Sequence, residues 1–154
     1  MPRRSDEKPP RITRLLPMCK AACCAAGLLA STLVQGEDLP AIALIIDDMG
    51  NHASHGEHAL SLDGRVTYAF LPHTPHARRL AERAHREGKE VMLHLPMDSH
   101  DGNQLGPGAL TLHMTERAFK RTLNANIEAI PHVAGLNNHM GSLLTRHPGA
   151  MAWL

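Results

Sequence analysis

Three short apolar runs, each ended by a turn signal or a proline, constrain the fold of this chain most. They span residues 41–46, 66–71 and 90–95 and are rich in branched side chains. Continuous apolar runs are typical of strands that are buried on both faces, as in parallel sheets. A weaker run at 132–136 predicts a fourth strand. The sequence therefore predicts a buried sheet of parallel strands.

Helical patterns separate these runs. One helix is predicted at 75–87, where a proline begins it and a glycine follows it. A second is predicted after Thr115, which can cap it, with an apolar stripe of Phe119, Leu123, Ile127 and Ile130 and a stop at Pro131. Shorter helices are expected at 52–60 and after His147, and a long loop at 96–113.

Strands that alternate with helices indicate an α/β fold, either an open sheet or a β/α barrel. We favour the barrel. In both architectures, ligands bind at the carboxyl ends of the strands, where the loops carry the reacting groups.

The first 36 residues have the composition of a secretory signal peptide. Six Lys and Arg residues precede an apolar run at 21–34, which is shorter than the roughly 20 residues that span a bilayer. We expect cleavage before Glu37 and a periplasmic domain of residues 37–154, in contact with the membrane only through the signal. An uncleaved N-terminal anchor is the alternative. All three cysteines lie in this segment, so the exported domain has no thiol chemistry.

The charge of the chain argues against nucleic acid as a partner. The whole sequence has 16 basic residues (Lys and Arg) and 15 acidic residues (Asp and Glu). The first 36 residues contain 6 of the basic and 2 of the acidic ones. The remaining domain therefore has 10 basic and 13 acidic residues, a net charge of −3. A nucleic-acid interface would need clustered basic residues with stacking aromatics. We therefore expect no nucleic acid partner.

Polar side chains stand where three of the predicted strands end. They are Asp47, Asp48, His94, Asn137, Asn138 and His139. One carboxylate and two imidazoles at neighbouring strand ends would supply the three protein ligands of a catalytic zinc site.

Each of these side chains also has a simpler interpretation. An aspartate of the 47–48 pair could cap the next helix, His94 could be a hydrogen-bonded core residue, and the 137–139 cluster could be a polar turn. Other histidines follow the same logic: His52, His55 and His58 share a helix face but are expected to be surface residues.

Three sequence motifs carry a family resemblance. Residues 46–50 read Ile-Asp-Asp-Met-Gly, 94–97 read His-Leu-Pro-Met, and 137–142 read Asn-Asn-His-Met-Gly-Ser. In their order and spacing they resemble the divergent polysaccharide deacetylase family, and the likeness covers nearly all of residues 40–154. The resemblance implies a distorted β/α barrel related to esterases that use a divalent metal, often zinc, to remove N-acetyl groups from amino sugars.

The resemblance also implies roles for individual residues. The metal ligands would be Asp48, His94 and His139, the base Asp47, and the substrate or oxyanion contacts Asn137 or Asn138. The family carries a further histidine where this chain has Asp98, so either Asp98 or His139 would complete the ligand set. The family pattern continues beyond Leu154, so we expect an incomplete barrel, the N-terminal half, as a truncated chain.

Two functions follow as expectations. The first is an exported metal-dependent deacetylase acting on a polysaccharide or peptidoglycan-type glycan. The alternative is a non-catalytic envelope protein that keeps the deacetylase fold to bind a glycan or a protein, and an inactive fragment is a third possibility.

Overall fold

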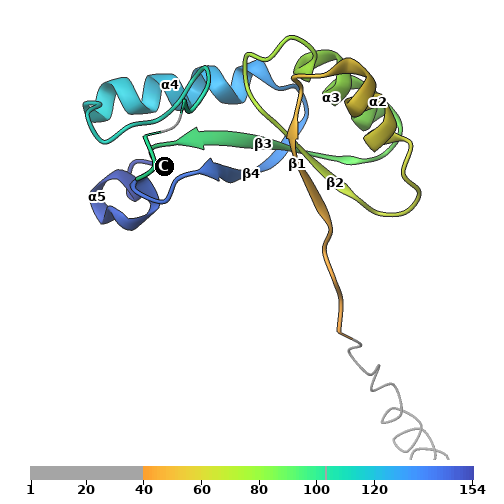
Figure 1. The fold of residues 1–154 in the computed structure, drawn as a ribbon, viewed down its shortest axis with the longest axis horizontal. Coiled ribbons are helices and arrows are strands. Elements are labelled where there is room, and N and C mark those ends of the chain that lie inside the picture. The colour runs from red at the N-terminus through yellow and green to blue at the C-terminus, as the bar shows by residue number, and fades with distance from the viewer. Residues whose placement is uncertain (1–39, 103) are drawn as a thin grey trace, which may run out of the picture. The chain divides into compact units, whose positions relative to one another are not determined.

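Four parallel strands form a single open sheet in the order β1-β2-β3-β4 (Figure 1). The strands are β1 (Ile45–Met49), β2 (Thr67–Phe70), β3 (Glu90–Met97) and β4 (Val133–Met140). The computed structural model describes residues 40–102 and 104–154, so the predicted signal peptide lies outside the described residues. Within those residues, no helix is both long enough and apolar enough to cross a lipid bilayer.

Helices follow each of the four strands. They are α2 (Ala53–Leu60), α3 (Ala77–Arg86), α4 (Glu116–Ala129), η1 (Leu144–Arg146) and α5 (Pro148–Met151). Figure 1 shows α2, α3 and α4 on the same side of the strands; α3 contacts β2 and β3, and α4 contacts β3. Parallel strands joined by helices on one side are the arrangement of an incomplete β/α barrel. The predicted fold class is therefore confirmed.

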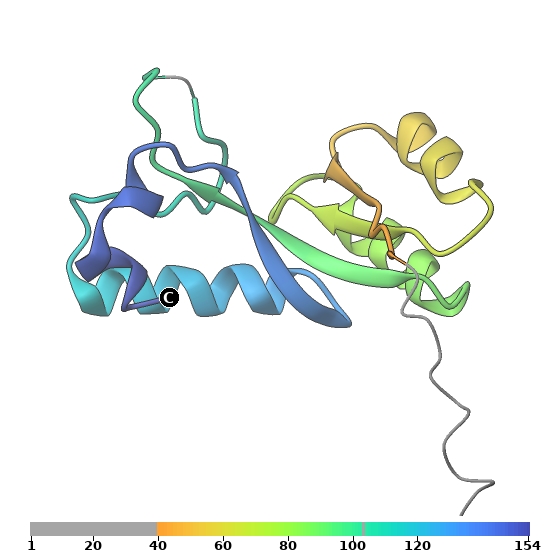
Figure 2. The same ribbon diagram turned by 90° about the horizontal axis from the view of Figure 1, so that it is seen from below.

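The core lies between the sheet and these helices; Figure 2 shows α4 running along β3 and β4. The odd-numbered residues of β3 from Val91 to Met97 are at most 2% exposed and pack with Leu80 of α3 and Phe119 of α4. Each such fully buried apolar side chain contributes about 2 kcal/mol to folding. Successive side chains of a strand point to opposite faces. His94 therefore points to the face that these helices leave uncovered.

Helix α4 forms where its capping and stop signals predict it. The Thr115 hydroxyl oxygen accepts a hydrogen bond from the Ala118 amide at 3.3 Å, and the helix ends before Pro131. Its buried stripe differs from the prediction, because Asn126 is 0% exposed whereas Ile127 is 38% exposed. Asn126 stands seven residues after Phe119, two helical turns along the same face.

The first and fourth strands do not have their predicted bounds. β1 begins at Ile45 and includes both aspartates, whereas residues 41–44 precede it and Ile42 is 96% exposed. The prediction of a buried strand at 41–46 was wrong, because β1 is an edge strand that pairs only with β2. β4 continues to Met140, so residues 137–139 belong to the strand instead of following it. The backbone of these three residues pairs with β3, and this pairing keeps them in a strand conformation although their side chains are polar.

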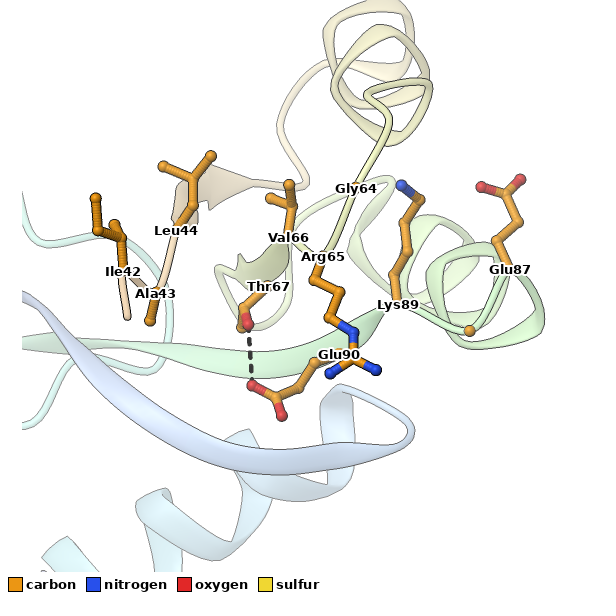
Figure 3. A pocket seen from close by; sticks show the side chains of 11 residues that line it. Ile42, Ala43, Leu44, Gly64, Arg65, Val66, Thr67, Glu87, Lys89 and Glu90 are labelled. Atoms are coloured by element: carbon orange, nitrogen blue, oxygen red, sulfur yellow. Dashed lines mark hydrogen bonds between the residues drawn. The ribbon is translucent and has the colours of Figure 1, made fainter. Parts of the chain in front are cut away.

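A cavity of about 490 Å³ lies at the amino ends of β1, β2 and β3 (Figure 3). It is lined by residues 42–44, 64–67 and 87–90, and the Thr67 hydroxyl donates a hydrogen bond to the Glu90 carboxylate across it at 2.9 Å. None of the residues predicted to carry chemistry lines this cavity. This cavity is thus at the opposite end of the strands from the one where ligands bind in a β/α fold.

Candidate metal centre

A β-bulge in β1 brings two neighbouring carboxylates to one place. The pairing with β2 advances three residues along β1, from Ile46 to Met49, while β2 advances two. Asp47 and Asp48 therefore occupy a space that a regular strand would give to one residue. Asp48 has a left-handed backbone with φ of 59°, a conformation that aspartate tolerates better than most residues. Because of the extra residue, both carboxylates reach the same cluster, whereas in a regular strand they would face opposite sides.

The end of β1 touches the start of α3, and only glycine fits there. A Cβ atom on Gly50 would lie 2.2 Å from the Thr74 hydroxyl oxygen and 2.9 Å from the Ala77 Cβ, and the φ of Gly50 is +122°. The Gly50 carbonyl accepts a hydrogen bond from the His76 amide at 2.9 Å. This contact fixes the direction in which the bulge leaves the sheet.

Three side chains converge on one point. The Asp48 Oδ1 atom lies 3.2 Å from His94 Nε2 and 3.0 Å from His139 Nδ1, and the two ring nitrogens are 3.2 Å apart. The pairing of β3 with β4 places both histidines on the same face, because His139 pairs with the residue two positions after His94. Among the described residues, this is the one cluster of His, Cys, Asp and Glu that could hold a metal ion.

The spacing and chemistry of these atoms fit a divalent metal. Ligand atoms about 2.0–2.2 Å from a tetrahedral zinc ion are separated from one another by about 3.3 Å. The observed separations of 3.0–3.2 Å are close to this value. Two imidazoles and one carboxylate are also the donor set of many catalytic zinc sites, which keep a fourth position for water or substrate.

Asn137 connects Asp47 to His94. Its side-chain nitrogen donates a hydrogen bond to Asp47 Oδ1 at 2.8 Å, and its side-chain oxygen lies 2.8 Å from His94 Nδ1. Both ends of the amide are thus engaged, although the sequence predicted that this residue contacts the substrate. Asn138 is exposed and donates to the Met140 carbonyl at 2.6 Å. A substrate contact for Asn137 or Asn138 stays a prediction.

The cluster is buried on one side and open on the other. The side chain of His94 is 5% exposed and that of His139 is 23% exposed, whereas Asp47 is 45% and Asp48 65% exposed. Asp48 and His139 line a cavity of about 400 Å³ together with residues from the loops that follow β1, β2 and β3. A ligand entering this cavity therefore meets the exposed side of the cluster, at the carboxyl ends of the strands.

The sequence of this chain matches a known family over most of its length. A sequence model described as divergent polysaccharide deacetylase matches residues 44–154. The chain belongs to the divergent polysaccharide deacetylase family. This confirms the resemblance carried by the three motifs, all of which lie within the matched residues.

Relatives of this deacetylase-family chain are longer than the chain itself. It is 33% identical over 117 residues to the uncharacterized protein YibQ of Escherichia coli K12, which covers 76% of this chain and 35% of YibQ. An uncharacterized protein of Haemophilus influenzae is 28% identical over 113 residues, which covers 73% of this chain and 40% of that protein. The chain thus spans less than half the length of both relatives.

A solved structure has a similar fold. The crystal structure of the uncharacterized protein ATU2773 from Agrobacterium tumefaciens C58 superposes with a TM-score of 0.67, at 22% sequence identity, over 72% of this chain and 46% of that one. At this identity the likeness concerns the fold, and it agrees with the incomplete barrel of this deacetylase-family chain.

Asp98, the alternative to His139 as a metal ligand, is not part of the cluster of Asp48, His94 and His139. Its Oδ2 atom accepts a hydrogen bond from the Leu112 amide at 3.3 Å, and its carbonyl accepts from the amides of Leu143 and Leu144. Asp98 therefore ties the long loop after β3 to η1, and His139 is the residue that joins Asp48 and His94. Of the histidines on the α2 side, His52 lines the cavity beside the cluster.

A buried amide that the sequence reasoning missed shapes the same cavity. The side-chain oxygen of Asn126 in α4 lies 3.0 Å from His73 Nε2. Its side-chain nitrogen donates a hydrogen bond to the Gly108 carbonyl at 2.8 Å. These bonds hold α4 against the loop that contributes residues 104–107 to the cavity. The available signal was a polar residue at a core position of the α4 stripe, since a fully buried amide requires partners.

Proposed function

We propose that this protein is an exported, metal-dependent hydrolase that removes N-acetyl groups from amino sugars of an envelope polysaccharide or peptidoglycan-type glycan. The observation that carries the proposal is the convergence of Asp48, His94 and His139 in a chain of the divergent polysaccharide deacetylase family. Zinc is the proposed metal, because two imidazoles and a carboxylate are typical ligands of catalytic zinc.

Asp47 is the proposed base. A divalent ion held by the cluster would polarise an amide carbonyl and acidify a water molecule. The Asp47 carboxylate lies beside the cluster, 3.7 Å from His94 Nδ1, and is 45% exposed, so water reaches it. Because Asn137 holds Oδ1 of this carboxylate, we assign to Oδ2 the proton that leaves the attacking water.

The amine that leaves the sugar amide requires a proton, and we propose His52 as its source. The titratable side chains that line the 400 Å³ cavity are Asp48, His139 and His52. The first two are assigned to the metal, which leaves the imidazole of His52 to protonate the departing nitrogen. Apolar side chains of the same cavity, among them Leu71 and Leu105, would contact the acetyl methyl group and exclude water from it.

Release of acetate tests this function. The purified protein loaded with zinc would be incubated with N-acetylglucosamine oligomers and with peptidoglycan fragments, and acetate and free amine would be quantified. We expect release by the wild type, and a loss of about 10²–10⁴-fold in kcat for Asp47→Asn with zinc content unchanged.

The two functions differ in the outcome of that assay. A zinc-loaded protein that binds these glycans in equilibrium dialysis but releases no acetate would support the non-catalytic envelope role instead. If neither binding nor release is found, both glycan-directed functions are contradicted.

Export is the second part of the proposal. The basic and apolar composition of the first 36 residues supports it. N-terminal sequencing of the protein recovered from a periplasmic fraction should begin at Glu37. Recovery of the uncut chain from the membrane fraction would indicate the N-terminal anchor instead.

A further inference from the structure

We infer that Asp47 and Asn137 together fix the tautomer of His94, so that its Nε2 atom presents a lone pair to the metal. Asn137 is then a positioning residue, which acts on the metal through His94. The inference concerns the ring of His94 in the metal-free protein, and its role in metal binding rests on the proposed function.

The carboxylate of Asp47 fixes the orientation of the Asn137 amide. An ionised carboxylate only accepts hydrogen bonds, so the group that faces Asp47 at 2.8 Å must be the NH₂ end of the amide. The carbonyl end of the same amide then faces His94. The position is set by the backbone, because Asn137 is the residue paired with His94 in the ladder between β3 and β4.

Two oxygen atoms fix the position of the proton on the His94 imidazole. His94 Nδ1 lies 2.8 Å from the Asn137 oxygen and 3.7 Å from Asp47 Oδ1. Both neighbours are oxygen acceptors, so Nδ1 carries the hydrogen and donates it. In a neutral imidazole the other nitrogen then has a free lone pair. The side chain of His94 is 5% exposed, so water competes little with this arrangement.

The lone pair of His94 Nε2 faces the other two side chains of the cluster. His94 Nε2 points at Asp48 Oδ1 and at His139 Nδ1, each 3.2 Å away. With Nε2 unprotonated, at most one hydrogen, on His139 Nδ1, can lie among these three atoms, and lone pairs at this distance repel one another. A cation removes the repulsion. The network therefore prepares the cluster for a metal ion, as carboxylate and carbonyl partners of metal-binding histidines do in general.

The same network links the base to the ligand set. Asp47 is held by the amide that holds His94, so a change at either end alters the other through one side chain. Hydrogen-bonded chains of this kind act together, because each bond polarises the next.

The test measures the tautomer and the metal affinity separately. Long-range ¹H–¹⁵N spectra of the metal-free protein at a pH where imidazoles are neutral report which nitrogen of His94 carries the proton, with His94→Gln used for assignment. Competition with a chelating dye gives the zinc Kd. We expect the proton on Nδ1 in the wild type. In Asn137→Leu, which keeps the volume but has no polar atom, we expect a mixture of tautomers and a zinc Kd raised about 10–100-fold.

Matched variants separate this role from a purely structural one. Asn138→Leu changes the neighbouring amide, which bonds only locally to the Met140 carbonyl, and should leave tautomer and Kd unchanged. Asn137→Asp retains an oxygen facing Nδ1 and should keep the proton there. Asp47→Asn retains an acceptor for Asn137 and should also keep it.

Two results would overturn the inference. One is a wild-type His94 protonated at Nε2. The other is an Asn137→Leu protein that is less stable but has the wild-type tautomer and Kd. A wild type with the Nδ1 proton and no zinc affinity would instead contradict the proposed function and leave the tautomer assignment standing.

Discussion

Replacing His94 with alanine should remove most of the stabilisation of the protein by zinc. The three donor atoms already lie within 3.2 Å of one another, so the ion binds with little rearrangement. At a zinc concentration of 100 times Kd, binding to the folded state adds about 2.7 kcal/mol to the free energy of unfolding. For a unit the size of Ala41–Leu154, 1 kcal/mol corresponds to about 4 °C, so we expect the wild-type Tm to rise by about 10 °C.

In the His94→Ala protein the gain should nearly vanish. Loss of a partner that only orients a ligand costs about 10–100-fold in metal affinity, and loss of the ligand itself costs more. At the same zinc concentration the stabilisation falls to about 0.4 kcal/mol or less, which is about 1–2 °C. Differential scanning calorimetry with and without zinc, after treatment with a chelator, measures both proteins.

His58→Ala is the matched control, because His58 is an exposed histidine on α2 and is not part of the cluster. It should retain the full zinc-dependent rise in Tm. A rise that survives in His94→Ala would refute the assignment. A rise that disappears in His58→Ala would refute it too and would place zinc on the histidine-rich face of α2.

Three further predictions concern the proposed proton donor His52, Gly108 in the loop after β3, and the surface pair of Glu82 and His132. His52→Gln should lower kcat about 10²–10⁴-fold on an N-acetyl sugar but little on an aryl acetate, whose leaving group needs no proton; steady-state kinetics on both substrates would show this. Gly108→Ala should lower the free energy of unfolding in urea by about 2–4 kcal/mol, because φ is +76° and the new Cβ would meet Asn126 Oδ1 at 2.1 Å. The hydrogen bond from His132 lowers the pKa of Glu82 from its ordinary value, so Glu82 stabilises the fold above that ordinary pKa and this stabilisation is lost as the pH falls. The Tm difference between wild type and Glu82→Gln should therefore be larger near neutral pH than in acid.

Elements with local signals were the ones that the sequence predicted well. Helix α4 lies between a capping threonine and a proline, and both signals act within one turn of the chain. The bounds of β1 were predicted wrongly, because an apolar run does not show whether a further strand pairs with it on its outer side. Residues 41–44 have the composition of a buried strand and yet lie exposed beside an edge strand.

The candidate site was predictable in its residues but not in its connections. Asp48, His94 and His139 stand out because polar side chains interrupt apolar strands, and the structure brings these three together. The hydrogen bonds of Asn137 to Asp47 and His94 depend on which residue of β4 pairs with His94. The register between strands that are distant in sequence cannot be read from the local sequence of either strand. The left-handed backbone of Asp48 is equally invisible, since aspartate is common in ordinary strand ends and turns.

The extra residue in β1 makes the length of this segment matter more than its composition. Deleting any one residue between Ile46 and Met49 would restore a regular strand in which adjacent side chains face opposite ways. Only Asp47 and Asp48 lie between these two residues, so one carboxylate would be lost with the deletion. The strand could then no longer supply both the proposed base and a metal ligand. Insertions and deletions here should therefore be lost from a functional lineage sooner than exchanges of Ile46 or Met49 for other apolar residues.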